Sequence, residues 1–139
     1  MNRGGFQPYI ASRTVRGDRV PQAVQGLVIR DYAGRQKLDA PRLPCAEYSM
    51  PGCYMMLETI LDDLPAIDGI ILYSLFMLPL KALRRREIYR RVLAAGCSLH
   101  GALEGLAIRG EDDIARVEDV IRMVQLTSGS ATPMQLGAA

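Results

Sequence analysis

The chain contains few residues of several types that often indicate a function. Its 139 residues contain no tryptophan, one histidine, three cysteines and only 6% aromatic side chains. The odd, unclustered cysteines favour neither a disulfide framework nor a zinc cage, and no other metal-ligand spacing is present. A P-loop and a complete dinucleotide fingerprint are also missing. The sequence therefore indicates no metal and names no cofactor.

Strong net charge and long apolar runs are missing as well. Seventeen Lys and Arg against fifteen Asp and Glu give a net charge of +2, which does not favour a nucleic-acid partner. The longest apolar run, Ile70 to Leu80, is broken by Ser74 and Pro79 and is too short for a membrane span. The N-terminal segment lacks the apolar core of an export signal. We expect a cytoplasmic protein with no membrane partner.

The pattern of strands and helices predicts one α/β domain over residues 1–126 and a flexible tail over 127–139. Alternating elements imply right-handed crossovers and a mainly parallel sheet of four to five strands flanked by helices, wound as in flavodoxin. The apolar segment from Ile67, ending in breakers up to Pro79, is typical of a fully buried strand. The other expected strands are Phe6–Ala11, Arg42–Tyr48, Cys97–Leu103 and a short piece at Ala107–Ile108. Helices are expected over Pro21–Gly34, Cys53–Leu64, Lys81–Leu93 and from Asp112 to Val124.

Such sheets bind ligands at the carboxyl ends of their strands, so polar residues at those positions are the candidate site. Ser12 and Arg13 follow the first strand. We expect them either to contact an anion or hydroxyl of a ligand or to form hydrogen bonds within a turn. Arg16 and Arg19 add charge for a phosphate or carboxylate, or form a solvated loop.

The second strand end offers Glu47 as an acid or base and Tyr48 as a substrate contact. Cys53 is expected in the first turn of a helix, where the dipole favours a nucleophilic thiolate. The alternative is a small buried hydrophobe, which is the expectation for Cys45 and Cys97.

Tyr73 and Ser74 follow the third strand and bind a ligand or cap the next segment. His100 is catalytic or structural, and Glu104 would orient or charge it. The basic run of the third helix is expected to be a solvated face, with phosphate or partner binding as the alternative. Its members are Arg84, Arg85, Arg86, Arg90 and Arg91.

Several short strings resemble the catalytic domain of serine resolvases and invertases, from about Tyr9 to Val124. They are YIAS (Tyr9–Ser12, the serine one position early), Gln22 and Gln25, Met50–Pro51, LYSLFMLP (Leu72–Pro79) and LEGL (Leu103–Leu106). The resemblance implies that Tyr9 lies at the site. However, Phe76, Met77 and Met50 replace that family's catalytic aspartate and arginines, and phosphoryl transfer needs such charges. The DNA-reading helix-turn-helix is also missing, so we do not expect recombination.

Longer strings are similar to the sporadic carbohydrate cluster family of small bacterial proteins. They read LVIRDYAG, AEYSMPGCYMMLE, DGIILYSLFMLP and SLHGALEGL. This resemblance implies a role beside surface-carbohydrate biosynthesis, without naming a reaction. We expect a small biosynthetic enzyme acting on a carbohydrate-type metabolite, forming a homodimer. The alternative is a non-catalytic resolvase-like module that dimerises and supports a partner biosynthetic enzyme.

Overall fold

The structure, a computed structural model, describes the backbone of residues 4–131 and the side chains of residues 4–127. Five strands form one sheet in the order β2-β1-β3-β4-β5. The strands are β1 (Phe6–Ala11), β2 (Cys45–Glu47), β3 (Gly69–Leu72), β4 (Ser98–Gly101) and β5 (Leu106–Ile108). The first four are parallel, and β5 runs antiparallel to β4. The predicted α/β class and mainly parallel sheet are thereby confirmed.

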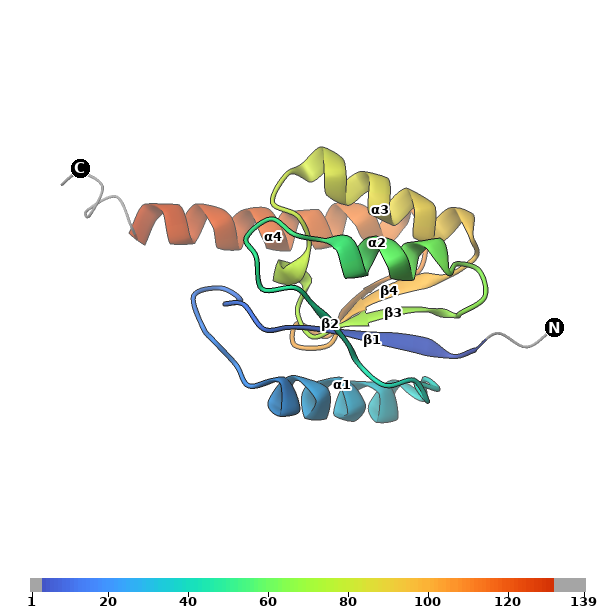
Figure 1. The fold of residues 1–139 in the computed structure, drawn as a ribbon. Coiled ribbons are helices and arrows are strands. Elements are labelled where there is room, and N and C mark those ends of the chain that lie inside the picture. Colours follow the sequence, from blue (N-terminus) through green and yellow to red (C-terminus); the bar gives the residue numbers. More distant parts are fainter. Residues whose placement is uncertain (1–3, 132–139) are drawn as a thin grey trace.

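Helices cover both faces of this sheet (Figure 1). One face carries α1 (Gln22–Gln36), and the other carries α2 (Met55–Asp62), α3 (Ala82–Ala94) and α4 (Asp112–Ala131). A short 3₁₀ turn, η1 (Leu75–Met77), follows β3. The chain leaves β1 toward one face and β3 toward the other, so the loops after these two neighbouring strands diverge at their carboxyl ends.

The central strand β3 is buried along its whole length, which explains its uninterrupted apolar sequence. Ile70, Ile71 and Leu72 are inaccessible to solvent and pack against both helical layers. Leu57 of α2, Ile88 of α3 and the other buried apolar residues complete one continuous core. The predicted buried strand is therefore correct, although it is shorter than the apolar run that contains it.

The start of β2 and the end of α4 differ from the predicted positions. The strand expected from Arg42 begins only at Cys45, because Pro41 and Pro44 lack the N–H that a ladder needs. The last helix was expected to end near Val124, with a tail from Thr127. It extends to Ala131, and residues 132–139 lie outside the described part of the chain.

The basic run on α3 is not the uniform solvated face that was expected. Arg85 is only 4% exposed. Arg91 is half-buried and joins α3 to α2 through Glu58 (2.8 Å) and Asp62 (2.9 Å). Arg84, Arg86 and Arg90 are exposed, as predicted.

Candidate functional site

Glu47 ends β2 with a carboxylate buried at the start of α2. Its Oε1 accepts hydrogen bonds from the Tyr9 hydroxyl (2.7 Å) and the Leu57 amide (3.0 Å). Its Oε2 accepts from the amides of Tyr48 (3.0 Å) and Met56 (3.1 Å). Since Tyr54, the residue just before α2, supplies no side-chain cap, Glu47 accepts hydrogen bonds from the open amides of the helix.

These contacts keep Glu47 ionised despite its burial. Burial alone would raise the pKa of this carboxyl, but the hydrogen bonds from Tyr9 and the backbone amides outweigh it and lower the pKa. Burial, followed by the hydrogen bond to Glu47, raises the pKa of Tyr9 far above its usual value. Glu47 and Tyr9 thus form a charged but internally satisfied pair, which holds an edge strand and a helix together.

Cys53 lies beside this pair but not in the helix. It precedes α2 by two residues, whereas the sequence predicted it within the first turn. Its thiol donates a 3.8 Å contact to Oε2 of Glu47. Arg13 donates to the carbonyls of Cys53 (2.8 Å) and Met50 (3.2 Å) and stacks on the Tyr54 ring at 4.7 Å. Arg13 therefore fastens the loop before α2 to the end of β1.

Ser74 and Glu104 meet at the carboxyl ends of β3 and β4. The Ser74 hydroxyl is fully buried and donates a 2.6 Å hydrogen bond to Oε2 of Glu104. Ser74 also accepts from the Phe76 amide (3.1 Å), while Oε1 of Glu104 accepts from the Leu75 amide (2.9 Å). Of the two alternatives for Ser74, local capping is thus observed, and Glu104 is part of the cap.

His100 lies on the α1 side of the sheet and is fully buried. Its Nδ1 lies 2.7 Å from the Tyr32 hydroxyl, and its Nε2 lies 2.8 Å from the Ser98 hydroxyl. Burial, with a smaller contribution from the positive charge of Arg109, lowers its pKa to about 4. The expected pairing of His100 with Glu104 is wrong, because Glu104 bonds Ser74 and Leu75 instead.

The loop after β1 is shaped by a tight turn. Val15 and Asp18 exchange backbone hydrogen bonds of 2.8 and 3.0 Å across Arg16 and Gly17, both of which have positive φ. Gln25 of α1 is fully buried and anchors the start of this loop, since its side-chain amide bonds both the N–H and the C=O of Ala11.

This turn lines a crevice at the point where the loops after β1 and β3 diverge. The cavity has a volume of about 210 Å³ and is bordered by Val15, Arg16, Asp18, Val20, Tyr73 and Leu103. It lies where doubly wound sheets are expected to bind ligands. We call this cavity the switch-point crevice.

Charges of both signs surround the switch-point crevice. Arg16 is exposed and stacks on the Phe76 ring at 5.0 Å. Burial, followed by the negative charges of Glu104 and Asp18, raises the pKa of Tyr73. The crevice therefore presents a guanidinium, a carboxylate and a neutral phenol.

The structure brings only part of the predicted site together. Tyr73 lies in the switch-point crevice, and Ser74 and Glu104 adjoin two of its residues in the chain. A separate group near α2 contains Tyr9, Arg13, Glu47 and Cys53. His100 lies on the opposite face of the sheet, against α1. Ser12 is half-buried after β1, while Arg19 and Tyr48 are exposed.

Sequence reasoning missed Asp18 and the anchoring role of Gln25. The signal for Asp18 was present, because Gly17 is typical of a two-residue turn whose flanking residues face each other. Two signals for Gln25 were present, because it is one of the resolvase-like positions and it lies seven residues before Tyr32, on the same helix face.

Three residues stand where the recombinases carry catalytic charges, and in this structure none of them forms a charged group. Met77 is buried, Phe76 is half-buried under Arg16, and Met50 is 58% exposed. Among residues 4–131, no His, Cys, Asp and Glu cluster has a metal-binding arrangement. None of the described helices has the length and hydropathy needed to cross a bilayer.

Comparison with known proteins supports the fold. No protein-family model matches the chain, and no curated protein matches it. Among solved structures, the chain is similar to a resolvase family site-specific recombinase from Streptococcus pneumoniae, with a TM-score of 0.59 and 10% sequence identity. The match covers 94% of this chain and 99% of the other. The chain therefore has a resolvase-like fold.

Proposed function

We propose that this chain is a small enzyme that binds a carbohydrate-type metabolite in the switch-point crevice. The observation that carries this proposal is the convergence of Arg16, Asp18 and Tyr73 on one cavity at the topological switch point. Guanidinium and carboxylate groups hydrogen-bond sugar hydroxyls, and a phenol adds both a flat apolar face and a polar tip. The volume of about 210 Å³ is smaller than the roughly 300 Å³ typical of drug-sized pockets, so the ligand is small.

Glu104 is the proposed acid or base of this enzyme. It is partly exposed, and its charge acts on Tyr73 in the crevice. The bond from Ser74 to Oε2 and the bond from the Leu75 amide to Oε1 fix the carboxylate in place. Ser74 is therefore a positioning residue. The choice of a carbohydrate rests on the strings that resemble the sporadic carbohydrate cluster family. We propose on the same basis that the enzyme acts in a cytoplasmic biosynthetic pathway.

Ligand binding to matched variants tests the proposal. Monosaccharides and sugar phosphates would be screened by calorimetry against the wild type, Asp18→Asn and Tyr73→Phe, with Asp39→Asn as a control on an exposed loop outside the crevice. We expect at least one sugar to bind, and Asp18→Asn to weaken it at least about tenfold, the effect of a lost charged hydrogen bond. Equal binding by Asp18→Asn and the wild type would overturn the assignment of the crevice.

A second candidate is the non-catalytic dimerising module, which α4 favours. This helix extends past the carboxyl end of the sheet (Figure 1), and Met123 and Leu126 on it are 66% and 65% exposed. Together with half-buried Val124 they form an apolar stripe beyond Ile121, the last buried residue of the helix among its described side chains. A second copy carries the same stripe, so two such helices bury it by packing together, with or without a partner biosynthetic enzyme.

The oligomeric state of charged variants tests whether this stripe on α4 forms a dimer. Leu126→Asp would convert a dimer to a monomer in light scattering, while Gln125→Asp, a neighbouring exposed position, would not. A monomeric wild type at high micromolar concentration argues against the module and leaves the sugar-binding experiment unaffected.

A further inference from the structure

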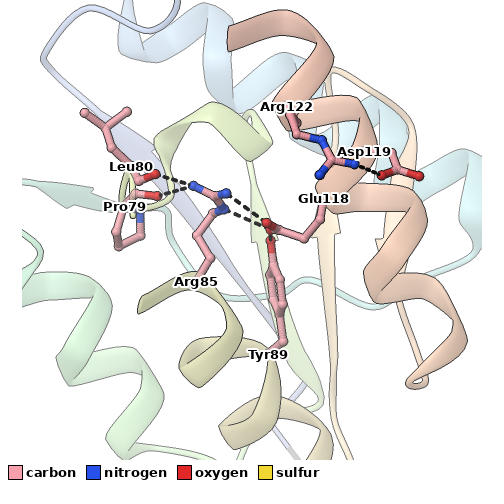
Figure 2. A network of polar contacts seen from close by, with 7 residues as sticks. All are labelled: Pro79, Leu80, Arg85, Tyr89, Glu118, Asp119 and Arg122. Carbon is pink, nitrogen blue, oxygen red and sulfur yellow. Dashed lines mark hydrogen bonds and ion pairs between the residues drawn. The ribbon is translucent and has the colours of Figure 1, made fainter. Parts of the chain in front are cut away.

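A buried ion pair joins α3 to α4 (Figure 2). Nε and Nη2 of Arg85 donate to the two carboxylate oxygens of Glu118, each at 2.8 Å. The hydroxyl of Tyr89 donates to Oε2 of the same carboxylate at 2.5 Å. Arg85 and Glu118 are only 4% and 8% exposed. The pair therefore fixes the guanidinium in one orientation.

Arg85 uses most of its hydrogen-bonding capacity inside the protein. Its Nη1 donates to the carbonyls of Pro79 (3.1 Å) and Leu80 (2.6 Å). With the two bonds to Glu118, these contacts account for four of the five N–H groups that a guanidinium carries. The remaining N–H is the second one on Nη2, and Arg85 is among the residues that line the space between the two helices.

A groove with a volume of about 300 Å³ lies against this junction. Its lining includes Arg85 and Arg86 from α3, and Glu118 and Arg122 from α4. Ala82 and Ala115 are short enough to leave the space between the helices open. Asp119 and Gln125 also line it. We call this space the α3–α4 groove.

The charges of the groove favour an anion. Glu118 pairs with Arg85. Burial alone would raise the pKa of Glu118, but the hydrogen bonds from Arg85 and Tyr89, followed by the positive charges of Arg85 and Arg86, outweigh it and lower the pKa. Asp119 pairs with Arg122 at 2.7 Å, but both side chains are more than 60% exposed, so this pair is weak and easily rearranged. Arg86 adds a third cation, and the lining therefore carries one more positive charge than negative.

We propose that the α3–α4 groove binds a phosphate group through Arg86, Arg122 and the remaining N–H of Arg85. A phosphate presents several acceptor oxygens, and guanidinium groups from two helices match them with charge-assisted hydrogen bonds. Gln125 at the rim adds a neutral donor. This site is separate from the switch-point crevice and does not depend on the proposed enzyme activity. It also gives a function to part of the basic run on α3.

Phosphate titration of the full chain at constant ionic strength tests the proposal. Amide chemical shifts of α3 and α4 would be followed by NMR as inorganic phosphate replaces chloride. We expect saturable shifts in the wild type, and a loss of affinity of at least about tenfold in Arg86→Gln and in Arg122→Gln, since each removes a charged donor. Arg116→Gln, an exposed change on α4 outside the groove, should bind within about twofold of the wild type.

A second pair of variants distinguishes a specific phosphate site in the groove from attraction by the net charge of the protein. Asp119→Asn frees Arg122 and should tighten phosphate binding, whereas Asp112→Asn, which changes the net charge equally on the same helix, should not. Equal effects within either pair, or a wild type with no saturable response, would overturn the proposal. Glycerol 3-phosphate provides a second probe. Tighter binding than that of inorganic phosphate supports an organic phosphate as the ligand, and equal binding supports the free anion.

Discussion

The hydroxyl of Tyr9 donates a 2.7 Å hydrogen bond to the Glu47 carboxylate, and this bond links the centre of the sheet to its edge. Tyr9 lies on β1 between two neighbouring strands, and Glu47 ends the outer strand β2. Because the same carboxylate caps α2, one buried charge determines the position of a strand and a helix.

Glu47→Gln should destabilise the fold by about 2–4 kcal/mol. Either orientation of the new amide places an NH₂ group against backbone N–H donors, which then lose their acceptor while buried. Urea unfolding followed by circular dichroism measures the change. Glu87→Gln, an exposed substitution on α3, should stay close to the wild type. Matching stabilities for the two variants would contradict the capping role.

Arg85→Ala should cost about 3–5 kcal/mol, because it leaves the buried Glu118 without its partner. The double variant Arg85→Met with Glu118→Leu should lose less than Arg85→Ala, because it removes both charges and keeps the volume. A double-mutant cycle of this double variant and its two single variants, Arg85→Met and Glu118→Leu, measures the coupling free energy of the pair in denaturant unfolding. Additive effects of the two single changes would show that the pair contributes no coupling.

Stability should fall on acidification from about pH 6.5 to about pH 4, with His100 as a main cause. The pKa of His100 is lowered to about 4, so in this range the unfolded chain takes up a proton that the folded chain does not. Two and a half pKa units correspond to a loss of about 3 kcal/mol. The lowered pKa values of Glu47 and Glu118 add a further loss that begins near their ordinary pKa of 4.5 and grows at more acidic pH. In His100→Asn, the slope of unfolding free energy against pH over this range should flatten; an unchanged slope would refute the assignment.

Two glycine substitutions should have opposite effects. A methyl group at Gly101 would lie 2.4 Å from Cγ of Leu75 and 2.9 Å from Oε1 of Glu104, so Gly101→Ala should destabilise the turn after β3. A methyl group at Gly34 on α1 meets nothing within 4 Å, and Gly34→Ala should stabilise the helix by up to about 1 kcal/mol. Thermal unfolding of both variants checks the signs.

The fold could be predicted because its signals are local. The predicted bounds of β1 match the structure, since Gly5 and polar Ser12 flank an apolar segment, and β3 was predicted from its apolar run. The site was harder to predict, because strand ends alone do not show which side chains meet. Glu47 was a candidate acid or base, but its partners come from α2, and only the folded chain shows that it caps this helix.

The partner of Arg85 could not be predicted from the sequence either. In the sequence it is one of several similar arginines. Its spacing from Ile88 and Val92 places it on their buried face of α3, but the sequence does not show which group accepts its hydrogen bonds. Its burial depends on Glu118, 33 residues later in the chain. Pairings between distant residues of this kind cannot be derived from the composition of either helix.

The sheet ends on both sides in strands of only three residues, β2 and β5. Short edges offer few open backbone groups to a neighbouring chain, which limits the stacking of sheets into extended assemblies. Association of this protein by adding strand to strand is therefore disfavoured at both edges. The short edges instead favour contacts through helices and loops, which leave the hydrogen bonds of the sheet undisturbed.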